Sequence, residues 1–209
     1  DVPEQTHRVI NVPLTSKQVE KLKELPTEFP DPLVLVGKKH QVEQGVLKGN
    51  EFEASQTFPT GKLEAIEDLY EEFGKVLVFA KYKEQIQQIH DYFRARLDGT
   101  VIFTLTGDTE NRGQLLESAD KNYNKIIVVC QSSISAGYEL PSFRCTIYAS
   151  QSYSYVDYAQ SLGRTLRINN LQKNLYVYLL SGDVDKAVYK ALENKGDFQE
   201  ATYANNRTI

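Results

Sequence analysis

The chain has 209 residues, of which 41% are hydrophobic and 25% are charged, so it can bury the core of one domain with an extension or of two small domains. A net charge of −4 and an isoelectric point near 5.5 argue against a diffusely basic surface, so any nucleic-acid contact must come from a local cluster of Lys and Arg. No stretch approaches about 18 apolar residues, and the N-terminal sequence lacks the layout of a secretory signal, so we expect neither membrane insertion nor export.

The first 74 residues are predicted to form a helical extension. Residues 9–25, "VINVPLTSKQVEKLKEL", predict a short strand and then a helix that is capped by Thr15 or Ser16. The Pro-rich "PTEFPDP" predicts a break, and the polar stretch at 36–59 predicts a helix and a loop. Residues 60–73, "TGKLEAIEDLYEEF", predict a second clear helix. We expect this extension, residues 1–74, to dock on a lobe formed by residues 75–209.

From residue 75 onward, short runs of Val, Ile and Leu alternate with segments of helical periodicity. Strands that are apolar at nearly every position are covered on both faces, and intervening helices permit right-handed crossovers between parallel strands. The pattern therefore predicts an α/β lobe with a mostly parallel, doubly wound sheet. Strands are expected at 75–80, 100–107, 125–130, 145–150 and 175–181, and helices at 83–97, 111–123, 154–169 and 184–195.

The two cysteines, Cys130 and Cys145, lie in the apolar runs "KIIVVCQ" and "FRCTIYAS". Cysteines in such runs are more often reduced core residues than parts of a disulfide framework or a metal site. His40 and His90 have no Cys or carboxylate neighbours at ligand spacing, so no metal site is expected at either.

The segment "DYAQSLGRTLRIN" is predicted to continue a helix that carries two arginines on one face. Gln160, Arg164 and Arg167 are separated by four and three residues, so their side chains are expected to form one stripe. A solvated amphipathic helix whose arginines merely face water is the alternative. Ser154 followed by Asp157 predicts a capped start. A neighbouring apolar stripe is expected to pack on the core; its residues are Tyr155, Ala159, Leu162 and Leu166. Gly163 would lie inside this helix at a cost in stability, and we expect close approach of another backbone to explain it.

Two loops that follow predicted strands have features of anion-binding turns. The small residues of "SSISAGYEL", 132–140, would let backbone N–H groups approach a phosphate, and Glu139 could accept hydrogen bonds from ribose hydroxyls. The turn "LTGDTENR", 105–112, leads to Arg112 in the first turn of a helix, where the dipole disfavours a cation unless an anion is near. Taken singly, each loop is better explained as a structural turn.

Tyrosines are concentrated in "YASQSYSYVDY", residues 148–158. Their rings could stack on nucleic-acid bases. Because strand ends and helix faces must be packed in this region, we favour core or rim packing for these rings.

In this order, the segments resemble the second RecA-like lobe of superfamily 2 helicases and translocases, most closely the Swi/Snf-type branch and its phage and bacterial relatives. Residues 75–93 resemble motif IV, 105–112 motif IVa, 128–150 motif V, and "QSLGRTLRI" motif VI in its Q-x-x-G-R-x-x-R form. Residues 12–25 and 60–73 are similar to segments that open this lobe in Swi/Snf-type enzymes.

The resemblance implies a role for each matched position. The motif VI arginines would act as catalytic arginine fingers, namely Arg164 and Arg167. Nucleotide contacts are implied for Gln160, Gly137 and Glu139. Contacts to the nucleic-acid backbone are implied for Lys81, Thr106, Arg112 and Ser133. Such backbone contacts position a protein without reading sequence.

The sequence contains no G-x-x-x-x-G-K-[ST] phosphate cradle and no acidic strand-end pair in a plausible position to hold Mg²⁺. We therefore expect ATP and Mg²⁺ to be bound mainly by an N-terminal lobe of the same polypeptide, and expect this chain alone not to hydrolyse ATP. The start at Asp1 and the absence of Met also suggest a piece of a longer polypeptide.

Three functions remain open at this point. The first is the C-terminal motor lobe of an ATP-dependent nucleic-acid translocase or helicase, with DNA as the expected track, in the cytoplasm of a bacterium or of a phage-infected host cell. The second is a non-catalytic module that binds nucleic acid or protein. The third is an unrelated nucleotide-dependent transferase, which would need a pocket closed within this chain, whereas a motor lobe should expose its arginines on an open face.

Overall fold

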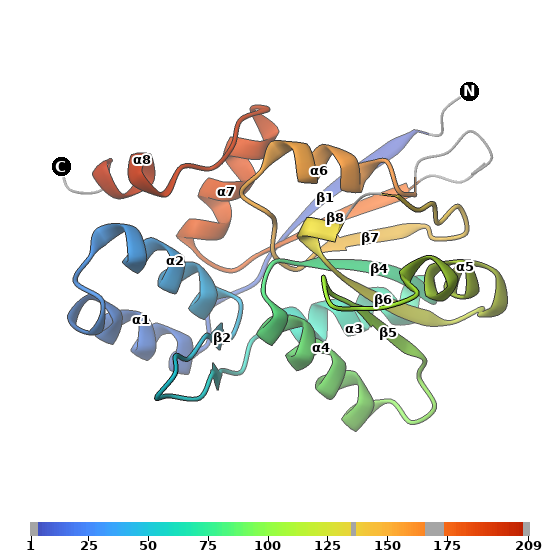
Figure 1. Cartoon of the computed structure of the whole chain (residues 1–209), viewed down its shortest axis with the longest axis horizontal. Helices are drawn as coiled ribbons and strands as arrows, with labels where there is room; N and C mark the ends of the chain where they lie inside the picture. The colour runs from blue at the N-terminus through green and yellow to red at the C-terminus, as the bar shows by residue number, and fades with distance from the viewer. Residues whose placement is uncertain (1–3, 135–136, 166–173, 207–209) are drawn as a thin grey trace.

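The computed structural model describes residues 4–134, 137–165 and 174–206, and a six-stranded sheet lies at its centre (Figure 1). The strands of this sheet are β1 (Gln5–Asn11), β4 (Lys75–Ala80), β5 (Ile102–Leu105), β6 (Ile126–Gln131), β7 (Cys145–Tyr148) and β8 (Asn174–Leu180). Their order is β1-β8-β7-β4-β6-β5, and every neighbouring pair is parallel. The predicted α/β fold with a mostly parallel, doubly wound sheet is confirmed.

Helices flank this sheet, and a small antiparallel hairpin of β2 (Val46–Leu47) and β3 (Gln56–Thr57) lies beside them. The helices are α1 (Ser16–Glu28), α2 (Pro32–Glu43), α3 (Lys62–Phe73), α4 (Lys83–Arg96), α5 (Arg112–Asn122), α6 (Tyr155–Leu162), α7 (Asp183–Glu193) and α8 (Glu200–Asn205), with a short 3₁₀ turn η1 (Ser132–Ile134).

Alternate residues of the central strands enter two different cores. In β4, Val76 and Val78 pack with α3 and α4, whereas Leu77 and Phe79 pack on the opposite face with α5. A strand that is buried on both faces needs an apolar side chain at nearly every position. This explains why "KVLVFA" and "KIIVVC" show no alternation of polar and apolar residues.

The N-terminal extension contributes a strand to the main sheet. Strand β1 lies at the edge and pairs with β8 in register from Gln5 with Asn174 to Asn11 with Leu180. Helices α1 and α2 lie beyond the carboxyl ends of the strands (Figure 1). The predicted strand and helices are present, and the division of the chain into residues 1–74 and 75–209 stays a prediction.

Helix α1 begins with a capping box, as its sequence predicts. Thr15 accepts a hydrogen bond from the Gln18 backbone N–H, and the Gln18 side chain accepts one from the Thr15 backbone. The helix continues through Pro26 to Glu28, so the predicted break begins later than expected. Pro26 has no backbone N–H, so one intrahelical hydrogen bond is missing in this last turn.

Cys130 and Cys145 are buried free thiols, in agreement with the prediction, and burial raises the pKa of each to about 12. Among the described helices, none combines the length and apolar character that crossing a bilayer requires.

Candidate nucleotide and nucleic-acid interface

The predicted site residues follow the carboxyl ends of neighbouring strands. Lys81 comes directly after β4, Thr106 directly after β5, and Ser133 lies in η1 after β6. These strands are parallel and adjacent in the order β4-β6-β5, so their carboxyl ends share one edge of the sheet (Figure 1). In open parallel α/β sheets, ligands bind outside this edge.

A cavity of about 320 Å³ brings three predicted residues together at this edge. Arg112 from the start of α5, Ser133 from η1 and Gly137 contribute to its lining, beside apolar Leu105 and Leu116. Gly137 has a φ of +91°, a left-handed conformation that favours glycine over residues with a side chain. The cavity therefore joins the predicted motif IVa and motif V segments.

The loops at this edge are also linked by polar contacts. The Thr106 N–H donates to Thr109 Oγ1 at 2.9 Å, and the Gly107 N–H donates to Gln131 Oε1 at 3.3 Å. An exposed ion pair between Lys83 and Asp108 connects the start of α4 with the loop after β5. Thr106 does not line the cavity that contains Arg112, although both residues lie on the same connection.

Helix α6 ends earlier than the sequence predicts. Its N-cap is Ser154, which accepts a hydrogen bond from the Asp157 N–H at 3.3 Å as expected, but its last residue is Leu162. Gly163 through Thr165 form a turn, so Arg164 lies beyond the helix and the expected helical stripe does not extend to it. A Cβ on Gly163 would lie 3.5 Å from the Gln160 carbonyl oxygen, an ordinary contact, so no backbone approach among the described residues requires this glycine.

Arg164 contacts the loop that carries Gly137 and Glu139. Its Nη1 donates to the Tyr138 carbonyl at 3.1 Å, and its Nε donates to the Gln160 carbonyl at 3.0 Å. The Arg164 carbonyl in turn accepts a hydrogen bond from the Leu140 N–H at 2.9 Å. Among the described residues, no carboxylate lies within ion-pair distance of this half-buried guanidinium.

The remaining nucleotide-binding predictions fall around the same loop. Gln160 near the end of α6 is exposed, and Gly137 and Glu139 are exposed on the loop beside Arg164. Arg167 lies outside the described residues, as does Leu166 of the predicted apolar stripe. Ala159 of that stripe is exposed, so the stripe does not pack as a continuous face.

Lys81 is partly buried beside two aromatic rings. Its Nζ lies 3.5 Å from the centroid of the Tyr153 ring and 5.9 Å from that of Tyr82. Burial lowers the pKa of Lys81, and the carboxylates of Glu200 and Asp157 act in the opposite direction. The predicted contact residue is therefore held against tyrosines at the carboxyl end of β4.

The tyrosines of residues 148–158 contribute to packing, as we favoured. Tyr148 is buried against Phe79 and Tyr178, with ring centroids 5.4 Å and 5.2 Å away. Tyr153 packs against Phe198 at 4.9 Å.

A buried polar network next to this edge was not found by the sequence analysis. The Asp185 carboxylate accepts hydrogen bonds from Lys62 Nζ at 2.8 Å and Gln44 Nε2 at 2.8 Å, and it lies 3.0 Å from His40 Nε2. Burial alone would raise the pKa of Asp185, but Lys62 and His40 outweigh it and hold the pKa well below its usual range. The partners come from three helices, and periodicity within one helix carries no signal for such a network.

Glu43 caps the N-terminus of α7 from a different helix. Its two carboxylate oxygens accept hydrogen bonds from the N–H groups of Val184 at 3.0 Å and Asp185 at 2.8 Å. Burial and the neighbouring Asp185 charge raise the pKa of Glu43 to about 7. A Cβ on Gly182 would lie 2.2 Å from Glu43 Cδ, so only glycine leaves room for this cap.

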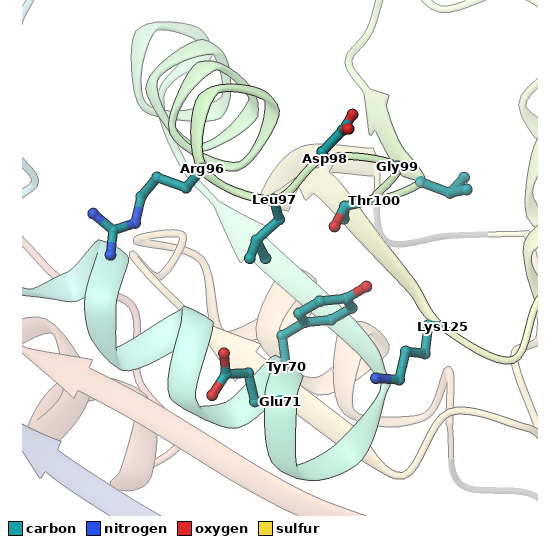
Figure 2. Close-up of a pocket in the computed structure, with 9 residues that line it drawn as sticks. Tyr70, Glu71, Arg96, Leu97, Asp98, Gly99, Thr100 and Lys125 are labelled. Carbon is teal, nitrogen blue, oxygen red and sulfur yellow. The ribbon is translucent and has the colours of Figure 1, made fainter.

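A larger cavity, of about 600 Å³, lies at the opposite edge of the sheet (Figure 2). The Tyr70 ring of α3 projects toward the loop at 98–100, and Arg96 and Lys125 lie at opposite ends of the cavity. None of the predicted site residues lines it. We assign the candidate interface to the carboxyl edge because the predicted residues gather there.

The chain was compared with known proteins. The family model described as "Helicase conserved C-terminal domain" matches residues 61–169, just over half of the chain. The ATP-dependent RNA helicase DBP7 of Meyerozyma guilliermondii is 30% identical over 66 residues, which are 32% of this chain and 9% of that protein. The chain therefore spans about a tenth of the length of this relative.

Solved structures share the fold. The C-terminal part of the Fun30 ATPase domain covers 97% of this chain and 95% of its own, with 13% identity and a TM-score of 0.72. The match to the Sulfolobus solfataricus SWI2/SNF2 ATPase core in complex with dsDNA covers 97% of this chain and 46% of that structure's chain, with 19% identity and a TM-score of 0.68. The match to S. cerevisiae Dbp5 bound to RNA and ADP BeF3 covers 66% of this chain and 37% of that structure's chain, with 14% identity and a TM-score of 0.54.

The family match confirms the resemblance to the C-terminal lobe of helicases, and the solved structures show that this chain shares its fold with SWI2/SNF2 ATPase cores. By the family match, which spans the predicted motifs from residue 61 to residue 169, the chain belongs to the helicase conserved C-terminal domain family.

Proposed function

We propose that this chain is the C-terminal motor lobe of an ATP-dependent DNA translocase or helicase, and that it supplies arginine fingers and contacts to the nucleic-acid backbone. The single observation that carries the proposal is the position of Arg164. Its guanidinium lies beside the loop with Gly137 and Glu139, and no carboxylate of the described residues neutralises it. A permanently charged, planar donor group at an open edge suits stabilisation of negative charge on a phosphoryl group in transfer.

The proposed track runs along the carboxyl edge of the sheet. Lys81, Thr106, Arg112 and Ser133 belong to connections that leave this edge, which suits contacts to successive phosphates. DNA is favoured over RNA because the likeness to the SWI2/SNF2 core in complex with dsDNA extends over 97% of this chain, against 66% for Dbp5 bound to RNA.

ATP and Mg²⁺ are proposed to be held mainly by an N-terminal lobe of the same polypeptide. In the described part of the chain, no group of three or more His, Cys, Asp or Glu side chains could hold a metal ion. On this chain, Arg164, Gln160, Gly137 and Glu139 would face the nucleotide, with Arg167 as the second finger.

The experiment compares arginine variants in the polypeptide that joins this chain to its N-terminal lobe. Arg164→Ala and Arg167→Ala should each abolish nucleic-acid-stimulated ATP hydrolysis while leaving the thermal unfolding midpoint unchanged. Arg164→Lys keeps the charge but loses the planar fork, so it should remain strongly impaired. Arg94→Ala, on the exposed face of α4, is the matched control and should be fully active.

Near-normal turnover in both alanine variants would reject the finger role and favour the non-catalytic module. Robust ATP hydrolysis by the present chain without any added lobe would contradict the proposed division of the active site. Membership of a helicase family gives no support to the unrelated transferase.

A further inference from the structure

The ammonium group of Lys81 lies beside aromatic rings, and the carboxylates of Glu200 and Asp157 act on it only through space in the part of the chain that the structure describes. Its Nζ lies 3.5 Å from the centroid of the Tyr153 ring, while no described residue accepts a hydrogen bond from it or forms an ion pair with it. Among the described residues, the hydrogen bond of Lys81 is made by its backbone, whose N–H donates to Ser150 Oγ at 2.7 Å. A partly desolvated ammonium with three unused donors is stabilised by an incoming anion.

The rings beside Lys81 are anchored by a buried histidine. The hydroxyls of Tyr82 and Tyr153 lie 2.8 Å and 3.1 Å from His40 Nδ1. On its other side, His40 Nε2 lies 3.0 Å from Asp185 Oδ1, and a carboxylate can only accept. We therefore assign the proton of neutral His40 to Nε2, which leaves Nδ1 to accept a hydrogen bond from one of the two tyrosine hydroxyls that lie beside it.

The histidine is in turn fixed by charges in the core. Lys62 Nζ donates to Asp185 Oδ2 at 2.8 Å, and the Ser181 N–H donates to the same oxygen at 3.1 Å. Lys62, His40 and Asp185 are all buried. The chain of contacts thus leads from three helices, α2, α3 and α7, to a cation at the rim.

We infer that Tyr153 and His40 are positioning residues that hold Lys81 as a phosphate-binding cation at the carboxyl end of β4. The ligand is a backbone phosphate of the nucleic acid, so this inference rests on the proposed function. It gives helix α2 of the N-terminal extension an indirect role in nucleic-acid binding, because α2 supplies the buried His40. The ring attracts the ammonium through its π-face and limits its movement, without itself touching the nucleic acid.

The test measures binding of this chain to a fluorescein-labelled duplex DNA of 20 base pairs by anisotropy, between 50 and 200 mM salt. The logarithm of the binding constant falls linearly with the logarithm of the salt concentration, and each lost phosphate contact makes this slope shallower by about 0.9. The variants Lys81→Gln and Tyr153→Leu should therefore each make the slope shallower by about one and weaken binding by roughly five-fold. The double variant should bind no more weakly than Lys81→Gln alone.

Two further variants separate positioning from general damage. Lys83→Gln removes a neighbouring exposed lysine that pairs with Asp108, and its effect should add to that of Tyr153→Leu. Tyr153→Phe keeps the ring but loses the hydroxyl that contacts His40, so it should show a smaller loss of affinity that again disappears in the Lys81→Gln background. This milder variant carries the test if Tyr153→Leu does not fold by circular dichroism.

The outcomes distinguish the proposed contact of Lys81 with the nucleic-acid backbone from the positioning role of Tyr153. If the unmodified chain does not bind DNA, or if Lys81→Gln leaves both affinity and slope unchanged, the proposed backbone contact fails and the inference fails with it. If Lys81→Gln weakens binding while the Tyr153 variants do not, or if their effects add in full to those of Lys81→Gln, the positioning role is overturned and the proposed function stands.

Discussion

Gly182 has no side chain because the Glu43 carboxyl group occupies the space that a Cβ would need. The φ of Gly182 is −140°, which any residue can adopt, so the requirement is steric and not conformational. At the scale of single residues, the close approach of α2 to the start of α7 depends on this position.

We expect Gly182→Ala to lower the free energy of unfolding by about 2 kcal/mol, because the added methyl group must displace the Glu43 cap. Chemical denaturation monitored by circular dichroism measures the loss. Gly113→Ala, inside α5 with no described residue within 4 Å of the new Cβ, is the matched control and should be neutral or slightly stabilising. Equal stability of the two variants would contradict the steric argument.

At the scale of elements, a buried ion pair joins α3 to α7. Lys62 and Asp185 are nearly inaccessible to solvent, and Lys62 Nζ also donates to the Ala149 carbonyl at 2.7 Å after β7. A buried pair of this kind is weak evidence for net stabilisation, but removing one partner leaves an uncompensated charge.

Lys62→Met should therefore lower the free energy of unfolding by about 3–5 kcal/mol at pH 8. The exposed pair of Lys121 with Glu117 offers the comparison, since Lys121→Met should change stability by no more than about 0.5 kcal/mol. Replacing both partners, as Lys62→Met with Asp185→Leu, should recover part of the loss. A single Lys62→Met variant as stable as the Lys121→Met variant would show that the network does not join these helices.

At the scale of the whole molecule, two buried groups give stability opposite dependences on pH. Burial lowers the pKa of His40, so its neutral form stabilises the fold and this contribution is lost as pH falls below about 6.5. The pKa of Glu43 is raised from 4.5 to about 7, so its contribution is fully present below 4.5 and is lost as pH rises to about 7.

Glu43→Gln removes only the second of these contributions. Relative to the unmodified chain, the variant should gain stability as pH rises from 5 to 8, on the order of 3 kcal/mol, and it should lose stability more steeply on acidification. Denaturation curves at closely spaced pH values test this directly. Parallel stability profiles for the two proteins would mean that Glu43 keeps an ordinary pKa in the fold.

Local patterns in the sequence predict the class of the sheet and the edge at which the predicted site residues gather. Runs such as "KVLVFA" report burial on both faces, and their alternation with helical segments permits parallel pairing, which brings Lys81, Thr106 and Ser133 to one edge. Each of these patterns lies within one short segment of the chain, so it can be recognised without knowing the fold.

Contacts between segments that are distant in the chain follow from the packing of the folded protein. His40 and Asp185 are 145 positions apart, and β1 pairs with β8 at the other end of the chain, so no periodicity links them. The end of α6 at Leu162, before Arg164, also depends on the Leu140 and Tyr138 backbone groups that bind the turn. A pattern within one helix describes the face it can bury, whereas the partners of polar and charged side chains are selected by packing among several elements.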